Sequence, residues 1–179
     1  MRLNLGCGQH KPEGYVNVDR QPAASPDQLW DLEVGWPVAD GVVEEISARH
    51  ILEHLHSTNH FMKEAYRVMV PGAPMTIVVP HPRSDAFYGD PTHVRPITYD
   101  TLCLYSKENC REFREARCAN TPLADYLDID FRVISYDVRL QPRWADMKRT
   151  KRITDEGLEQ ALSMYNNVAD ELTFILERV

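Results

Sequence analysis

The sequence predicts a single α/β domain built on a doubly wound, mostly parallel sheet with an antiparallel strand at one edge. In the first half of the chain, strands alternate with helices, which indicates a mostly parallel sheet covered on both faces. Two later strands can pair antiparallel at one edge. A chain of 179 residues suits one domain with a substantial core and is short for two.

Five strands are predicted in the first half of the chain. The first is short and ends at the turn Gly6-Cys7-Gly8, and the fifth is strongly apolar, as a central parallel strand should be. A stretch rich in Pro, Ala and Ser, residues 20–28, is predicted to be a loop. The five strands are predicted at residues 3–5, 15–18, 29–32, 44–48 and 74–79.

A helical region is predicted between the fourth and fifth strands. Apolar residues recur at intervals of three and four over residues 51–69, which is the spacing of one helix face. Ser57 or Thr58 is placed to cap a break inside this region, and Pro71-Gly72 ends it.

The second half mixes irregular and regular segments. Residues 80–96 are dense in Pro, His and Asp and are predicted to be irregular, and Thr98 can cap a helix that begins at Tyr99. The further elements are a helical stretch at 107–119, a strand at 131–140, a helix at 155–168 and a last strand at 171–179.

The composition is that of a typical soluble protein, with 43% apolar and 26% charged residues. No apolar run approaches the roughly 18 residues that a membrane span needs, so we expect no membrane partner. The first predicted strand begins at Leu3, which leaves no room for a signal peptide. The four cysteines form neither a CxxC pair nor a disulfide scaffold. We therefore expect reduced thiols and a cytoplasmic protein.

The net charge of −7 argues against a general nucleic-acid binder, which would carry a basic stripe. One basic cluster opposes this trend, and only Asp146 lies among its members. It suits a phosphate or another acidic partner, although a solvated surface loop is the favoured interpretation. Its residues are Arg139, Arg143, Lys148, Arg149, Lys151 and Arg152.

Polar and glycine residues follow the first three predicted strands at the ends where a ligand binds. In a doubly wound sheet, ligands bind at the carboxyl ends of the strands. Gly6 and Gly8 allow the backbone to approach a ligand closely, and Asp19 can accept hydrogen bonds from both hydroxyls of a ribose. Together with Asp31-Leu32 after the third strand, they predict a site for an adenosine-containing cofactor.

Several segments resemble, in order and spacing, the motifs of class I S-adenosylmethionine-dependent methyltransferases. The resemblance covers about residues 2–98 and rests on Leu3–Gly8, Val16–Asp19, Asp31-Leu32, Arg49–His54 and Glu64–Gly72. It implies that residues 1–179 form one Rossmann-like methyltransferase domain, with room for a lid or substrate insertion at 142–169. It also implies S-adenosyl-L-methionine as the cofactor, bound by Gly6, Cys7, Gly8, Asp19, Asp31, Leu32 and His50.

The chain departs from the family's pattern in the first motif. His10 stands where the family has a third glycine, and Asn4 stands where it usually has an acidic residue. The gap from Gly8 to Tyr15 is too short for a full helix between the first two strands. These departures leave a second interpretation open, a non-catalytic binding or structural protein that keeps the fold. A nicotinamide-dependent enzyme is disfavoured because its fingerprint needs a third glycine and a more distant acidic residue than Asp19.

Methyl transfer from a sulfonium needs aligned reactants and, for a hydroxyl or amine, a base that removes a proton. Histidine is a natural base near neutral pH. His93, with Asp90 to orient it or the substrate, is the preferred candidate, and both lie in the loop after the fifth strand. The loop is similar to segments of methyltransferases resembling those of glycan-modification clusters, which favours an oxygen of a small-molecule or glycan acceptor. The alternative is a structural turn capped by Asp90.

The pattern His50-x-x-Glu53-His54 invites two metal interpretations. It matches the HxxEH pattern of a protease class, which the methyltransferase motif order disfavours. It also resembles the Glu-x-x-Glu-His of some small-RNA and quinone-pathway O-methyltransferases, which bind a divalent cation, and His81 would add a ligand. Such a set suits zinc or another transition metal better than magnesium. The favoured interpretation is metal-free, with His50 beside the methionine end of the cofactor and His54 packed below it.

Overall fold

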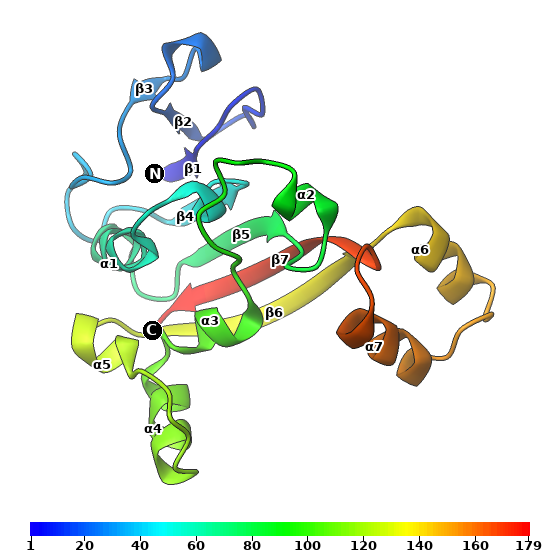
Figure 1. The fold of residues 1–179 in the computed structure, drawn as a ribbon. Helices are drawn as coiled ribbons and strands as arrows, with labels where there is room; N and C mark the ends of the chain where they lie inside the picture. Colours follow the sequence, from blue (N-terminus) through cyan, green and yellow to red (C-terminus); the bar gives the residue numbers. More distant parts are fainter.

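The computed structural model describes residues 1–179 and contains one seven-stranded sheet (Figure 1). The strand order is β3-β2-β1-β4-β5-β7-β6. Strands β1 to β5 run parallel, and β7 is antiparallel to both of its neighbours, so the predicted sheet is confirmed. The strands are β1 (Arg2–Leu5), β2 (Val16–Asp19), β3 (Gln28–Leu29), β4 (Glu45–Arg49), β5 (Pro74–Pro80), β6 (Phe131–Leu140) and β7 (Ala169–Arg178).

The α-helices all follow β4 in the chain, and the connections β1–β2 and β3–β4 contain none (Figure 1). Two short 3-10 helices, η1 (Pro22–Ala24) and η2 (Leu52–His54), complete the fold. The α-helices are α1 (Thr58–Val68), α2 (Asp85–Tyr88), α3 (Tyr99–Cys103), α4 (Lys107–Glu115), α5 (Leu123–Leu127), α6 (Pro142–Arg149) and α7 (Asp155–Met164).

Local capping signals set two helix starts as predicted. The Ser57 hydroxyl accepts a hydrogen bond from the main-chain N–H of His60 and begins α1, separately from η2. The Thr98 hydroxyl accepts from the main-chain N–H of Thr101 and begins α3. A side-chain oxygen of this kind satisfies a main-chain donor that has no partner within the helix.

Two predicted segments differ from the structure. Strand β3 has two residues instead of four, because the chain turns at Asp31, whose carboxylate accepts from the main-chain N–H of Glu33. The basic segment favoured as a surface loop contains the helix α6, with Pro142 in its first turn. The fixed φ of proline suits that position, and its missing N–H is not needed there. The helices α2 and α5 also form where none was predicted.

The apolar core lies on one face of the sheet. Cross-strand partners on this face form buried rows, one of which is Leu3, Ile46, Met75 and Leu176. Helix α1 adds Phe61 and Met62 to the same cluster. The adjacent row on the opposite face is polar and includes Asn4, Ser47 and Thr76. The two faces of the sheet are therefore unequal, and the apolar layer supports the strands from one side.

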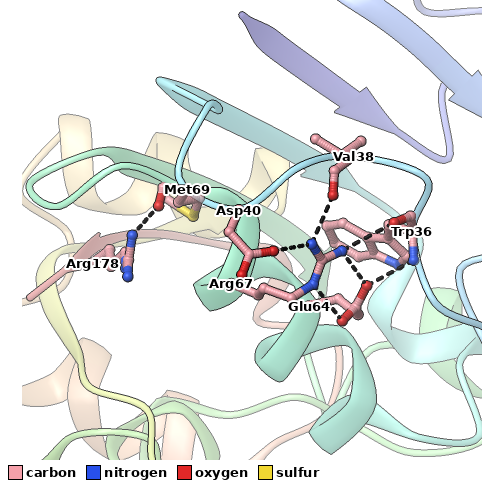
Figure 2. Close-up of polar contacts among 7 residues, drawn as sticks. All are labelled: Trp36, Val38, Asp40, Glu64, Arg67, Met69 and Arg178. Carbon is pink, nitrogen blue, oxygen red and sulfur yellow. Dashed lines mark hydrogen bonds and ion pairs between the residues drawn. The ribbon is translucent and has the colours of Figure 1, made fainter.

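Arg67 of α1 holds the helix-free connection from β3 to β4 in place (Figure 2). The Glu64 carboxylate that pairs with Arg67 also accepts from the main-chain N–H of Trp36 at 2.7 Å. The remaining contacts of the guanidinium are to the carbonyl oxygens of Trp36 and Val38, at 3.0 and 2.7 Å, and to the carboxylate of Asp40, at 2.6 Å. These polar contacts tie the connection to α1, and Trp36 also packs its ring against Phe61 of that helix.

We expect Arg67→Ala to lower the free energy of unfolding by about 2–3 kcal/mol, because it leaves a mostly buried carboxylate and two carbonyls without their donor. Denaturant unfolding followed by circular dichroism measures the change. Lys63→Ala, an exposed position on the same helix, is the matched control and should stay within about 0.5 kcal/mol of the wild type. Equal stability of the two variants would contradict the role given to Arg67.

Candidate active site

A cavity of about 350 Å³ lies at the carboxyl ends of β1, β2 and β4. Trp30, Ile51 and Leu55 give it an apolar wall, which suits the stacking of a purine ring. Six of the seven predicted cofactor residues line it, namely Gly6, Gly8, Asp19, Asp31, Leu32 and His50. The structure therefore brings together side chains that are up to 44 positions apart in the sequence, from Gly6 to His50.

The turn after β1 brings the backbone to this cavity. Gly6 has a φ of +65°, and a Cβ at this position would lie 2.8 Å from the side chain of Ile51. Only glycine fits such a conformation and such a close approach. The main-chain N–H of Gly8 donates to Oδ2 of Asp19 at 2.9 Å. Cys7, the seventh predicted residue, is buried and contributes no lining atom to the cavity.

Asn4 anchors the β1–β2 loop that stands in place of a crossover helix. Its side chain is buried, and its amide nitrogen donates to the carbonyl of His10 at 2.7 Å and to Oδ1 of Asn17 at 2.9 Å. An acidic side chain at position 4 would have no N–H to donate. The side chain of Asn4 is therefore hydrogen-bonded to the main chain of His10, so the two departures in the first motif belong to one loop structure.

A second cavity, of about 490 Å³, adjoins the first. His50 and His54 line both cavities and mark the boundary between them. The predicted catalytic residues His93 and Asp90 both line the second cavity. The other lining residues are Glu53, Pro80, Ala86, Arg139, Asp170 and Glu171. The lining is therefore rich in carboxylates and imidazoles and holds little apolar surface.

His50 stands at the end of β4 between two carboxylates. Its Nε2 lies 2.8 Å from Oε1 of Glu171, and its Nδ1 lies 3.3 Å from Oε1 of Glu53. These two carboxylates raise the pKa of His50, against the lowering effect of burial. Its φ of +51° is unusual for a residue other than glycine, and such backbone strain is concentrated at functional sites.

Asp90 contacts His54 through Thr92. Oδ1 of Asp90 accepts from the main-chain N–H and the hydroxyl of Thr92, at 2.8 and 2.6 Å, and these bonds lower the pKa of Asp90. Since the Thr92 proton goes to Asp90, the Thr92 oxygen accepts from Nδ1 of His54 at 2.9 Å. The predicted pairing of Asp90 with His93 is looser, because Oδ2 of Asp90 lies 3.9 Å from Nε2 of His93.

His93 is held by a main-chain carbonyl and by two rings. Its Nδ1 donates to the carbonyl of Phe87 at 2.6 Å, which fixes the tautomer because a carbonyl only accepts. The Phe87 ring stacks on the imidazole at a centroid distance of 5.3 Å, and the His54 ring meets it edge-on at 4.6 Å. The Nε2 of His93 is therefore left with a free lone pair.

Sequence analysis missed the contribution of β7 to this site. Asp170 and Glu171 stand at the start of that strand and line the second cavity. Arg139 of β6 pairs with Glu171 at 2.9 Å. Two adjacent acidic residues at the head of an apolar strand were a usable signal, because that end of β7 meets the carboxyl end of β5 in the antiparallel pair.

Comparison with known proteins gives matches at the level of structure. No protein-family model and no curated protein matches the sequence. A SAM-dependent methyltransferase from Archaeoglobus fulgidus superposes with a TM-score of 0.67 at 20% identity, over 99% of this chain and 85% of its own. The YcgJ protein from Bacillus subtilis gives 0.56 at 15% identity, over 99% and 92%. A geranyl diphosphate C-methyltransferase from Streptomyces coelicolor, solved with Mg²⁺, geranyl diphosphate and S-adenosyl-L-homocysteine, gives 0.53 at 13% identity, over 99% and 73%.

The chain has the class I methyltransferase fold. Between β6 and β7, a pair of helices, α6 and α7, extends away from the sheet (Figure 1), and that residues 142–169 are an insertion stays a prediction. The pair has a small core of its own around Leu158 and Ala161. At its end, Asn167 accepts from the main-chain N–H of Asp85, beside the second cavity. A role as a lid stays a prediction.

The basic cluster of this methyltransferase fold is partly neutralised by the protein's own carboxylates. Arg149 and Arg152 both pair with Asp146, and Arg139 pairs with Glu171. Lys148 lies 3.9 Å from Asp155, so four of the six basic side chains of the cluster are engaged within the chain. No helix has the length and the apolar character that crossing a membrane requires.

Proposed function

We propose that this chain is a methyltransferase that uses S-adenosyl-L-methionine and methylates an oxygen of a small-molecule or glycan acceptor. The observation that supports this best is the contact between the two cavities at His50 and His54. A methyl donor in the first cavity and an acceptor in the second would meet at that boundary. The main contribution of a protein to this transfer is to hold the two reactants in line.

The first cavity suits the cofactor group by group. Asp19 would accept hydrogen bonds from the ribose hydroxyls, and Asp31 and Leu32 would contact the adenine. The main chain of the turn at Gly6 would approach the cofactor closely, because glycine has no side chain to obstruct it. His50, at the boundary, would line the methionine end.

The second cavity suits a polar acceptor whose hydroxyl must lose a proton. We propose His93 as the base, since its Nε2 carries a free lone pair while its Nδ1 is fixed by Phe87. Asp90 would act indirectly. Through Thr92, it would fix the tautomer and the ring orientation of His54. The charged and imidazole lining favours a hydroxyl-rich acceptor such as a glycan over an apolar one.

The decisive experiment is a calorimetric titration of the full chain with S-adenosylmethionine and S-adenosylhomocysteine. We expect binding of one ligand per chain, followed by transfer of a labelled methyl group to hydroxyl acceptors, with glycans screened first. Absence of binding at millimolar ligand would overturn the proposal and favour a non-catalytic protein that keeps the fold. Binding without transfer to any hydroxyl acceptor would overturn the oxygen acceptor and direct the search to amines.

A further inference from the structure

The carboxylate of Glu53 is buried without a hydrogen bond. The residue has no exposed surface, and neither carboxylate oxygen takes part in a hydrogen bond. Nδ1 of His50 is the near neighbour at 3.3 Å, but its geometry does not make a hydrogen bond to the carboxylate. Buried charges in proteins are paired, hydrogen-bonded or bound to metals. The His50 imidazole thus lies near one oxygen only, and both carboxylate oxygens remain free of hydrogen bonds and able to bind a cation.

Two imidazoles stand next to this carboxylate. Glu53, His54 and His93 each offer one ligand atom, and these three atoms lie within 4.8 Å of one another. Nδ1 of His54 donates to Thr92 and Nδ1 of His93 donates to Phe87, so each ring keeps its Nε2 lone pair free. A carboxylate and two imidazole rings thus converge, and no hydrogen bond joins the carboxylate to either ring.

We propose that Glu53, His54 and His93 bind a divalent transition-metal ion such as Zn²⁺. Two imidazoles and one carboxylate are a common ligand set for Zn²⁺ and for Fe²⁺, and a site with three protein ligands keeps positions open for water or substrate. The outer contacts also fit, because metal-binding histidines donate their second N–H to a carbonyl or to a carboxylate-linked group. Here those groups are the Phe87 carbonyl and the Thr92–Asp90 pair.

The backbone holds the three side chains together. Glu53 and His54 are neighbours in η2, and the main-chain N–H of Val94 donates to the carbonyl of Glu53 at 2.7 Å. This bond ties the loop that carries His93 to η2. The site is therefore built on two anchored segments, and no backbone movement is needed to bring the ligands close.

This ligand set differs from the one that the sequence pattern suggested. Nδ1 of His81 accepts from the main-chain N–H of Arg83, and His81 lines neither cavity. His50 is held by Glu171 instead of joining the three ligands. The third ligand is His93, which comes from the loop after β5 and lies next to the acceptor cavity.

A metal at this place would face the acceptor cavity, and a hydroxyl bound to it would have a lowered pKa. In that state Nε2 of His93 would be a ligand, so its role as a base would apply to the metal-free protein. This catalytic consequence rests on the proposed function, whereas metal binding itself does not.

The test is titration of the chelator-treated full chain with Co²⁺ and Zn²⁺, followed by calorimetry and, for Co²⁺, by visible absorption. We expect one ion per chain, and a loss of affinity of at least about tenfold in both Glu53→Gln and His93→Gln. His81→Gln is the matched control and should bind as the wild type does. Circular dichroism shows whether each variant is folded, and either substitution alone suffices if the other prevents folding.

Two results would overturn the inference. One is a folded wild type that binds neither ion below millimolar concentration, and the other is unchanged binding in both ligand variants. Titration of the same samples with S-adenosylhomocysteine separates this inference from the proposed function. Metal binding without cofactor binding would overturn only the proposed function. Cofactor binding without metal binding would overturn only the proposed metal site.

Discussion

Asp19→Ala is expected to weaken the binding of S-adenosylmethionine about 100-fold or more. The proposed reason is that the carboxylate would accept two charge-assisted hydrogen bonds from the ribose hydroxyls. The same carboxylate holds the glycine turn, because it accepts from the main-chain N–H of Gly8 and of Gln21. The substitution thus removes a direct contact and loosens the loop that faces the cofactor. Calorimetric titration with S-adenosylhomocysteine measures the effect.

Two further variants sharpen this prediction. Asp19→Asn keeps an acceptor oxygen but loses the charge, so its affinity should fall between those of the wild type and Asp19→Ala. Asp137→Ala removes an exposed carboxylate of β6 that lines neither cavity, and its affinity should not change. If Asp19→Ala bound the ligand as tightly as Asp137→Ala does, the first cavity would not be the cofactor site.

His93→Gln is expected to lower methyl transfer to the acceptor about 10²- to 10⁴-fold, the range over which general bases act. Cofactor affinity should stay nearly unchanged, because His93 lines only the second cavity. Single-turnover transfer of a labelled methyl group measures the rate, and calorimetry measures the affinity. His81→Gln, which lies outside both cavities, is the control that should keep full activity. Unchanged transfer in His93→Gln would mean that His93 is not the base and that another residue has this role.

The two roles given to His93 differ in their dependence on metal. If His93 acts as a free base, treatment of the wild type with a chelator should leave the rate unchanged. If His93 acts as a ligand, the chelator should abolish transfer, and added Zn²⁺ or Co²⁺ should restore it in the wild type but not in His93→Gln. The same variant thus gives different results under the two mechanisms.

Short-range signals predicted the regular elements well. The side-chain caps at Ser57 and Thr98 act within three residues, so the sequence shows them directly. Helix α6 was not predicted because its residues are mostly polar and exposed, with no buried member. A helix that buries no side chain lacks the apolar periodicity on which the prediction depends.

The sequence by itself determined the strands of the parallel sheet and the residues of the proposed cofactor side. The predicted alternation of strands with helices over the first half was wrong, because the α-helices all follow β4. Gly6, Gly8 and Asp19 stand just after predicted strands and Asp31 stands near the end of one, and the geometry of parallel sheets places such residues at one edge. Only the tertiary structure decided the acceptor side. Glu171 meets His50 across 121 positions because β7 pairs with β5. Glu53 becomes a buried carboxylate without a hydrogen bond, and the loop with His93 is bonded to its backbone. These contacts depend on strand order and loop packing, which bring together residues that no local pattern relates.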